Sequence, residues 1–404
     1  MHPRAHPYLS AAFAGRSTPF DVAMGALFII AAWLLTQVVI GGAAFTLDLG
    51  PEIAELRAEM DREMRASANA DMDVGTALGI LLGLVGVVLA PLGYLIYRTA
   101  SALAGRILGW SGLAGVVVAA TVLVLGATGG TGPAAESFQA ALLGTSALAY
   151  ALVLFSFVGA FVGAWLVQHF VHARTLTSLL TAARRIRWSR LVWAAALTLG
   201  VYGLLAWGLS LFGIGEYRVN PERSRMLPFL LATLLFIPVQ ASAEEVIFRG
   251  YLNQALARVI PSALVVFAIT SVAFGALHLA NPEIAAAKAD GTFWVAFAGY
   301  CLFGFVLCLV VWFDNGLEAA CGIHIANNIF AATFINYDNS ALPIPGLWIT
   351  ESAGAATEAM TALALLGLVA AILWWTRLPL TDPGEPLLHP VRDSTPGDPR
   401  EASA

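Results

Sequence analysis

The sequence has few charged residues and almost no lysine. Only 12% of its 404 residues are charged, whereas a soluble domain carries about 25%. Hydrophobic residues make up 59% of the chain, the mean hydropathy is +0.78, and Lys288 is the single lysine. This composition excludes an ordinary soluble domain and indicates a lipid bilayer as the surroundings. The net charge of −5 is spread over tails and loops, so nothing indicates a nucleic-acid partner.

Cysteine is also scarce. Cys301, Cys308 and Cys321 all fall in apolar segments, and an odd number of such cysteines does not predict a disulfide framework. We interpret them as small packing residues. The first apolar run, 22–45, is longer than the core of a signal peptide, which has about 7–15 residues. We therefore expect it to be a retained membrane helix.

Long apolar runs dominate what is present. A spanning helix needs about 20 mostly apolar residues. That length predicts ten spans, at 21–45, 76–97, 109–127, 141–167, 191–213, 227–243, 262–280, 293–313, 316–336 and 358–377. The predicted fold class is therefore all-α, a polytopic transmembrane helical bundle of about ten spans. Fourteen of the 21 arginine and lysine residues then lie on the inner side, which predicts a multi-pass protein of the cell inner (plasma) membrane with both termini cytoplasmic.

The remaining segments divide the chain into regions. Residues 1–20 are a predicted cytoplasmic tail, and 21–213 hold the N-terminal transmembrane helices. Within the latter, 51–73 is acidic with helical spacing, whereas the arginine-rich 174–190 is typical of an interfacial helix on an anionic leaflet. Three regions follow, namely a region at 227–336 that carries charges inside apolar segments, an outer loop with the last transmembrane helix at 337–378, and a disordered tail at 379–404.

Three charges interrupt an otherwise apolar segment in "ASAEEVIFRGYL". Glu245 and Arg249 are spaced i,i+4 with the acid first, which favours an ion pair on a helix. Glu244 points about 100° away from Glu245 and is free to act. Ionisable groups in a membrane segment are costly, so we interpret this cluster as functional. The alternative is that the helix has left the membrane and carries ordinary surface charges.

Two histidines strengthen the functional interpretation. Of seven histidines, only His278 and His324 lie in membrane segments, and Asn328 follows His324 by one helical turn on the same face. Glu244 and His278 are both about 24–27 Å along their helices from the intervening turn, so they can face each other. We expect Glu244, His278, His324 and Asn328 to line one polar cavity in the core of the bundle.

The three clusters form an ordered set of motifs. "EEVIFR" fits E-E-x-x-x-R, "FGALH" from Phe274 to His278 fits F-x-x-x-H, and "HIANN" from His324 to Asn328 fits H-x-x-x-N. In this order, inside membrane segments, they resemble the motifs of the CAAX protease and bacteriocin-processing (CPBP, or Abi) family of intramembrane endopeptidases. The resemblance covers about 227–336 and implies a bundle of eight or more helices around a polar cavity.

The resemblance also implies a role for each motif residue. Glu244 would activate a water with help from His278, while His324 and Asn328 would polarise the scissile carbonyl and stabilise the oxyanion. Supporting roles would fall to Glu245, Arg249 and Phe274. The implied partners are a membrane peptide or protein as substrate and the lipid bilayer.

A metal ion is an open alternative. Glu244, His278 and His324 form the ligand set of several catalytic zinc sites. The family has been described both as metalloproteases and as metal-free glutamate proteases. Because the chain has no H-E-x-x-H helix, we favour metal-free hydrolysis.

Two other functions compete with proteolysis. One is a catalytically silent scaffold or immunity-type protein that uses the cavity only for binding; such a protein need not keep all four polar groups. The other is a proton-coupled transporter. Transporters commonly contain two related halves, and the first half of this sequence holds no second copy of E-E-x-x-x-R or F-x-x-x-H.

Overall fold

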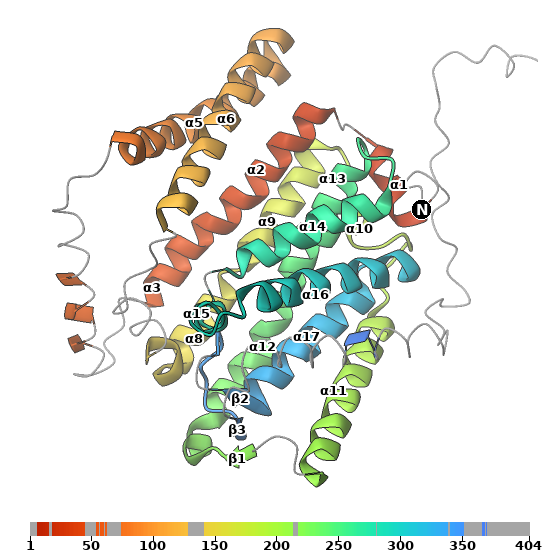
Figure 1. The fold of residues 1–404 in the computed structure, drawn as a ribbon. Coiled ribbons are helices and arrows are strands. Elements are labelled where there is room, and N and C mark those ends of the chain that lie inside the picture. Colours follow the sequence, from red (N-terminus) through yellow and green to blue (C-terminus); the bar gives the residue numbers. More distant parts are fainter. Residues whose placement is uncertain are drawn as a thin grey trace, which may run out of the picture.

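The protein folds as a helical bundle (Figure 1). The computed structural model describes residues 6–15, 18–44, 54–55, 57–59, 61–62, 74–127, 141–212, 217–279, 281–337, 340–350, 366–367 and 369. The elements of the first half are α1 (Pro7–Ser10), η2 (Ala11–Phe13), α2 (Pro19–Thr36), η3 (Gln37–Gly41), α3 (Gly42–Ala44), α5 (Val74–Thr99), α6 (Ala102–Ala127), α8 (Ala147–Phe155), α9 (Val158–Leu166), η4 (Val167–Val171), α10 (Thr177–Leu180) and α11 (Trp188–Leu211). The second half consists of β1 (Tyr217–Val219), η5 (Pro221–Arg225), α12 (Met226–Glu245), η6 (Val246–Leu252), α13 (Asn253–Ala257), α14 (Ala263–Leu277), α15 (Pro282–Ala289), α16 (Phe293–Asp314), α17 (Glu318–Thr333), β2 (Ile335–Tyr337) and β3 (Trp348–Thr350).

The predicted helical membrane fold is confirmed, but the count of ten spans is not. Among the described residues, six helical stretches are long and apolar enough to cross a membrane, or seven if one bent pair counts as a span. The six are Pro19–Ala44, Leu81–Thr99, Ala147–Val171, Trp188–Gly208, Pro221–Ala257 and Phe293–Asp314. The bent pair is α14 and α15, whose axes differ by 88°.

The remaining predicted spans have different outcomes. Helix α6 covers the predicted span 109–127, and α17 forms within 316–336, but neither is among the six. With 16 residues, α17 is shorter than the bilayer core requires and packs against α11, α12 and α16. The predicted span 358–377 and the acidic helix 51–73 lie largely outside the described residues, and the tail 379–404 lies entirely outside them.

The charged motif lies inside the longest helical stretch. Helix α12 continues through η6 into α13, so helical structure runs without a break past Glu244 and Glu245. Element η6 is a π-helix that begins directly after Glu245 and includes Arg249. π-Helical turns are rare in proteins overall, and those that occur are often found at functional sites.

The prediction of a helix over 174–190 is wrong. Within this segment, only the four residues of α10 are helical before α11 begins at Trp188. Two arginines of this segment instead point inward. Arg187 donates to both carboxylate oxygens of Glu318 and also pairs with Asp314, while Arg190 pairs with Asp314. Buried acids on α16 and α17 thus hold this segment in the bundle, a pairing that helical periodicity alone could not reveal.

The turn between α16 and α17 brings these two acids together. Asn315 ends α16 in the left-handed conformation, with φ 57°, a common way for a helix to stop. Asp314 and Glu318 therefore flank the turn and face the same arginine, Arg187.

The N-terminal segment, predicted as a tail, packs against the bundle. The Tyr8 side chain is fully buried, and its hydroxyl donates to the carbonyl of Leu179 at 2.6 Å. His6 stacks on Trp312 of α16, with ring centroids 4.0 Å apart. Figure 1 shows α1 beside α13.

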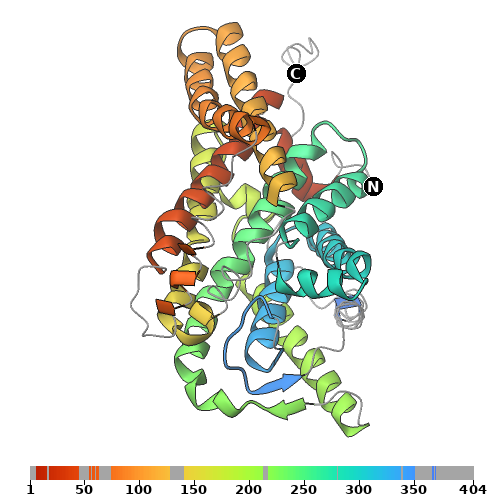
Figure 2. The same ribbon diagram turned by 60° about the vertical axis from the view of Figure 1, so that its left-hand side comes forward.

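A small sheet, which the sequence analysis did not predict, closes one end of the bundle. Strand β3 is central; it pairs antiparallel with β1, where Tyr217 lies opposite Thr350, and parallel with β2, where Tyr337 lies opposite Thr350. Figure 2 shows these strands at the end of α12 and α17. The sheet positions the segment after β2 beside the cavity described next.

Candidate active site

A cavity of 460 Å³ lies among the helices, and all four predicted catalytic residues line it. Glu244 comes from α12, His278 directly follows α14, and His324 and Asn328 come from α17. The structure therefore brings together three motifs that are separated by up to 84 positions in the chain. Aromatic residues form much of the remaining wall, namely Trp33, Tyr150, Phe157, Phe274, Tyr300, Phe303 and Tyr337.

Glu244 has one hydrogen-bonded and one unpartnered carboxylate oxygen. Its Oε1 accepts a hydrogen bond from Gln240 Nε2 at 2.5 Å. Its Oε2 is buried and has no hydrogen-bond partner among the described residues, and His324 Nε2 lies 3.8 Å from it. A buried, unpaired carboxylate oxygen is costly to keep, which is typical of a group reserved for a ligand or a reaction.

Glu245 supports the site from behind. This residue is completely buried, and its Oε1 accepts hydrogen bonds from Arg249 Nη1 at 2.9 Å and from His324 Nδ1 at 2.8 Å. The predicted Glu245–Arg249 ion pair is therefore present. The Arg249 guanidinium also lies over the Phe274 ring, 4.3 Å from its centroid, so the second motif packs directly on the first.

The contacts of His278 determine which ring nitrogen carries a proton. Nδ1 lies 2.8 Å from the carbonyl oxygen of Phe274. Because a carbonyl only accepts hydrogen bonds, Nδ1 is the donor, and Nε2 of the neutral ring is left as an acceptor. The ring stacks on Tyr300, with centroids 4.5 Å apart, and the Tyr300 hydroxyl accepts a hydrogen bond from Asn281. His278 is thus oriented to accept a proton or a hydrogen bond at Nε2.

His324 has the same arrangement with a stronger partner. Its Nδ1 donates to the Glu245 carboxylate, which leaves Nε2 facing Glu244. The ring can donate from Nε2 only when both nitrogens are protonated.

Asn328 belongs to a chain of side-chain amides. Its Nδ2 donates to Gln240 Oε1 at 3.0 Å, and Gln240 in turn donates to Glu244. Its Oδ1 accepts a hydrogen bond from Asn327 Nδ2. The Oδ1 of Asn327 in turn accepts a hydrogen bond from the Tyr202 hydroxyl. The amide nitrogen has two N–H groups, so one remains for a ligand while the other bonds Gln240.

Three of these residues were not predicted from the sequence. Gln240 precedes Glu244 by four residues on the same helix, so helical spacing could have identified it. Asn327 is adjacent to the third motif. Tyr300 carries no local sequence signal, because its place beside His278 depends on how α16 packs against α14.

The residues do not form a ready metal site. Among the described parts of the chain, no group of three or more His, Cys, Asp and Glu side chains is arranged to hold a metal ion. The Nδ1 atoms of His278 and His324 both bond protein acceptors, so only the Nε2 atom of each ring could bind a metal, which is a usual arrangement for histidine ligands. The zinc ligand set considered from sequence is thus not assembled here, and we derive no step through a metal.

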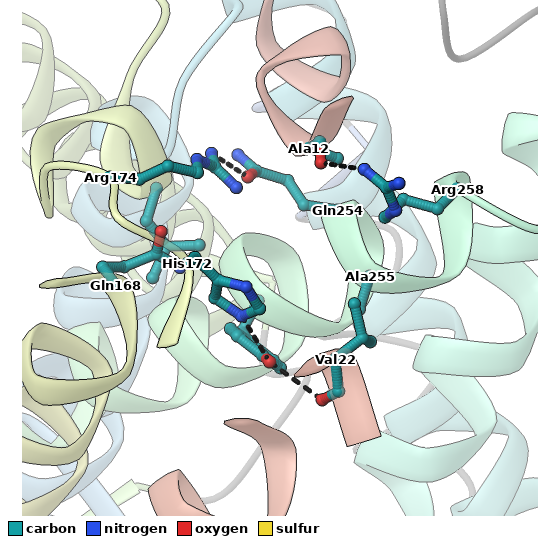
Figure 3. Close-up of a pocket in the computed structure, with 10 residues that line it drawn as sticks. Ala12, Val22, Gln168, His172, Arg174, Gln254, Ala255 and Arg258 are labelled. Carbon is teal, nitrogen blue, oxygen red and sulfur yellow. Dashed lines mark hydrogen bonds between the residues drawn. The ribbon is translucent and has the colours of Figure 1, made fainter. Parts of the chain in front are cut away.

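A second polar pocket, shown in Figure 3, lies between η4, α13 and the N-terminal segment. Its volume of 10 Å³ corresponds to about one water molecule. Side chains across it bond one another, as Arg174 donates to Gln254 and His172 Nε2 lies 2.9 Å from the Tyr251 hydroxyl (Figure 3). Arg258 donates to the carbonyl of Ala12. We interpret the contacts around this pocket as those that attach the N-terminal segment to the bundle.

Comparison with known proteins gives the same placement as the motifs. The profile of the family described as type II CAAX prenyl endopeptidase Rce1-like matches residues 224–330, which include all four predicted catalytic residues. The uncharacterized protein YyaK of Bacillus subtilis (strain 168) is 30% identical over 224 residues, which cover 53% of this chain and 70% of YyaK. No solved structure matches the chain significantly.

Proposed function

The chain belongs to the family of Rce1-like type II CAAX prenyl endopeptidases, and from that premise we propose that it is an intramembrane endopeptidase. It would hydrolyse a peptide bond of a membrane peptide or protein at or within the bilayer. Membership of a protease family and the apolar helices support a multi-pass membrane peptidase. The observation that carries the proposal is the single cavity lined by Glu244, His278, His324 and Asn328.

In the proposed reaction Glu244 is the general base. A water bound at Oε2 loses a proton to the carboxylate while its oxygen attacks the carbonyl carbon of the scissile bond. Glu244 is suited to this role because Gln240 already holds its Oε1 and fixes the carboxylate plane. His278 Nε2 accepts the second hydrogen bond of the same water and orients it.

The oxyanion that forms on the carbonyl oxygen is stabilised by two donors from α17. Asn328 offers its remaining amide N–H, and His324 offers Nε2–H when its ring carries both protons. Glu245 accepts a hydrogen bond from Nδ1 and so fixes the orientation of that ring. The tetrahedral intermediate then collapses as the C–N bond breaks, and Glu244 returns its proton to the leaving amine nitrogen. The new carboxyl group and the free amine are the products.

The proposal is tested by comparing membrane peptides from cells that express the wild-type protein or Glu244→Gln. Peptides that end at a common cleavage site should be present with the wild type and missing with the variant. The purified wild-type protein in lipid nanodiscs should then cut a synthetic peptide spanning that site. Identical peptide sets from both cells would reject the protease and favour a silent scaffold that uses the cavity for binding.

We also propose that both termini face the cytoplasm of the plasma membrane, as the arginine distribution predicts. Reporter fusions after Phe45 and after Arg377 should then report opposite sides of the membrane. Matching sides would reject the placement of both termini in the cytoplasm.

A further inference from the structure

The cavity contains a second carboxylate that the proposed hydrolysis does not use. Glu283 lies in the first turn of α15 and is 8% exposed. Its Oε1 accepts hydrogen bonds from the Tyr337 hydroxyl and from the backbone N–H of Ala341, each at 2.8 Å. Its Oε2 is buried and has no hydrogen-bond partner among the described residues. The structure thus fixes this acid firmly and leaves one oxygen unsatisfied.

Apart from His278 and His324, the acidic and basic side chains that line the cavity are all acidic. Glu244 and Glu283 both line it, whereas no lysine or arginine is among its described lining residues. The nearby Arg249 lies outside the lining and is paired with Glu245. A cationic group entering this cavity would therefore meet complementary charge, and an anionic group would be repelled.

The wall beside these acids is apolar and comes from the N-terminal helices. Trp33 on α2, Tyr150 and Leu154 on α8, and Phe157 directly before α9 all line the cavity. These residues lie outside the range 224–330 that matches the family profile. The cavity therefore combines an apolar wall particular to the N-terminal half with an unsatisfied carboxylate on α15.

We propose that Glu283 binds the positively charged side chain of a lysine or arginine in the substrate, flanked by apolar residues that pack on the α2–α8 wall. This inference rests on the proposed protease function and names the substrate class that the same cavity selects. Burying an unpaired carboxylate oxygen is unfavourable, and a charge-assisted hydrogen bond from a substrate cation relieves that cost.

The test uses a pair of matched amphiphiles that do not require cleavage. N-decanoyl agmatine carries a guanidinium group on an apolar tail, and N-butyl decanamide is its neutral counterpart. Binding to the full-length protein in phosphatidylcholine nanodiscs is measured by titration calorimetry, with empty nanodiscs as the blank for partitioning into lipid. We expect the wild type to bind the cationic probe at least about tenfold more tightly, as a charge-assisted hydrogen bond implies.

The decisive variant is Glu283→Gln. The glutamine keeps an acceptor for Tyr337 and Ala341 but removes the charge, so the preference for the cationic probe should fall to less than about threefold with folding retained. Glu222→Gln is the matched control, because Glu222 lies on the exposed surface with Arg225 and should leave the preference intact. A preference that persists in Glu283→Gln, or a wild type that binds neither probe saturably, would overturn the proposal.

A further variant separates this inference from the proteolytic function. In Glu244→Gln the proposed base is absent, yet the carboxylate of Glu283 is unchanged. If the protease proposal fails but the cation site exists, Glu244→Gln should still prefer the cationic probe. That preference should still depend on Glu283. If the protein is a protease but Glu283 is not its cation site, cleavage occurs while Glu283→Gln binds both probes as the wild type does.

Discussion

His324 donates a hydrogen bond of 2.8 Å from Nδ1 to Oε1 of Glu245, the second glutamate of the charged motif. The same oxygen also accepts from Arg249. The two adjacent glutamates therefore have separate tasks. Glu245 holds the third motif in place, and Glu244 presents its carboxylate to the cavity. This division explains why an apolar helix tolerates two neighbouring acids.

The first prediction concerns Glu244→Gln. The amide preserves the shape and the contact with Gln240 but cannot take a proton from water, so proteolysis should fall by at least about 100-fold. The midpoint of thermal unfolding in detergent should change little. Cleavage of a peptide substrate and thermal unfolding are measured on the same preparation. An active Glu244→Gln enzyme would reject the glutamate-base mechanism.

The second prediction concerns Gln240, which bridges Glu244 and Asn328. Gln240→Ala removes both hydrogen bonds and frees the Glu244 carboxylate and the Asn328 amide to rotate. We expect kcat to fall by about 10- to 100-fold with KM nearly unchanged, because the bridge positions groups that act in the transition state. Gln240→Glu keeps one acceptor but adds a charge beside Glu244, and should be at least as inactive. A change confined to KM would contradict a positioning role.

The helices around the site could be predicted from sequence because hydrophobic length and ordered motifs are local properties. Helical spacing also predicted the Glu245–Arg249 pair, which is present at 2.9 Å. In contrast, nothing local indicated that Glu245 is shared with His324, since the two residues are 79 positions apart. Contacts of this kind follow from the packing of α12 against α17.

The basic segment 174–190 shows the opposite case, in which a local pattern misled. Its arginines interleave with apolar residues and resemble an interfacial helix, yet Arg187 and Arg190 are buried. Their partners are Asp314, which lies in the short stretch between two predicted spans, and Glu318, which lies in the predicted span 316–336. Two acids at i,i+4 in apolar sequence indicate that buried cations must pair with them, but not which ones.

The third prediction concerns Arg249→Ala. The substitution leaves the fully buried Glu245 without its cationic partner and removes the guanidinium from the Phe274 ring. Breaking a buried pair costs about 3–5 kcal/mol, so the unfolding midpoint should drop strongly. Arg225→Ala is the matched control, because it breaks an exposed pair with Glu222 that contributes about 0–1 kcal/mol. Equal losses in the two variants would contradict the buried role of Arg249.

The fourth prediction concerns pH and the N-terminal segment. Burial against Trp312 lowers the pKa of His6 below its usual value of 6.5. The unfolded chain therefore binds a proton more readily than the folded one, and stability should decline as the pH falls below about 6.5. His6→Phe retains an aromatic ring on Trp312 without a titrating group. We expect its unfolding midpoint to decline less than that of the wild type between pH 7 and pH 5, measured in one detergent.

The last prediction concerns the buried ionic cluster where α11, α16 and α17 meet. Arg187 bonds Glu318 through two nitrogens and also pairs with Asp314, so Arg187→Ala leaves two buried acids short of positive charge. We expect a loss of about 3–5 kcal/mol in unfolding free energy. Arg187→Lys should recover only part of it, because an ammonium cannot reproduce the two-pronged contact.

The control is Arg185→Ala, whose side chain is exposed and whose loss should change stability by less than about 0.5 kcal/mol. Arg187 does not line the 460 Å³ cavity, so the folded fraction of Arg187→Ala should still cleave substrate at a rate within about threefold of wild type, a difference below about 1 kcal/mol. Stability equal to that of Arg185→Ala would show that the cluster does not hold the three helices together.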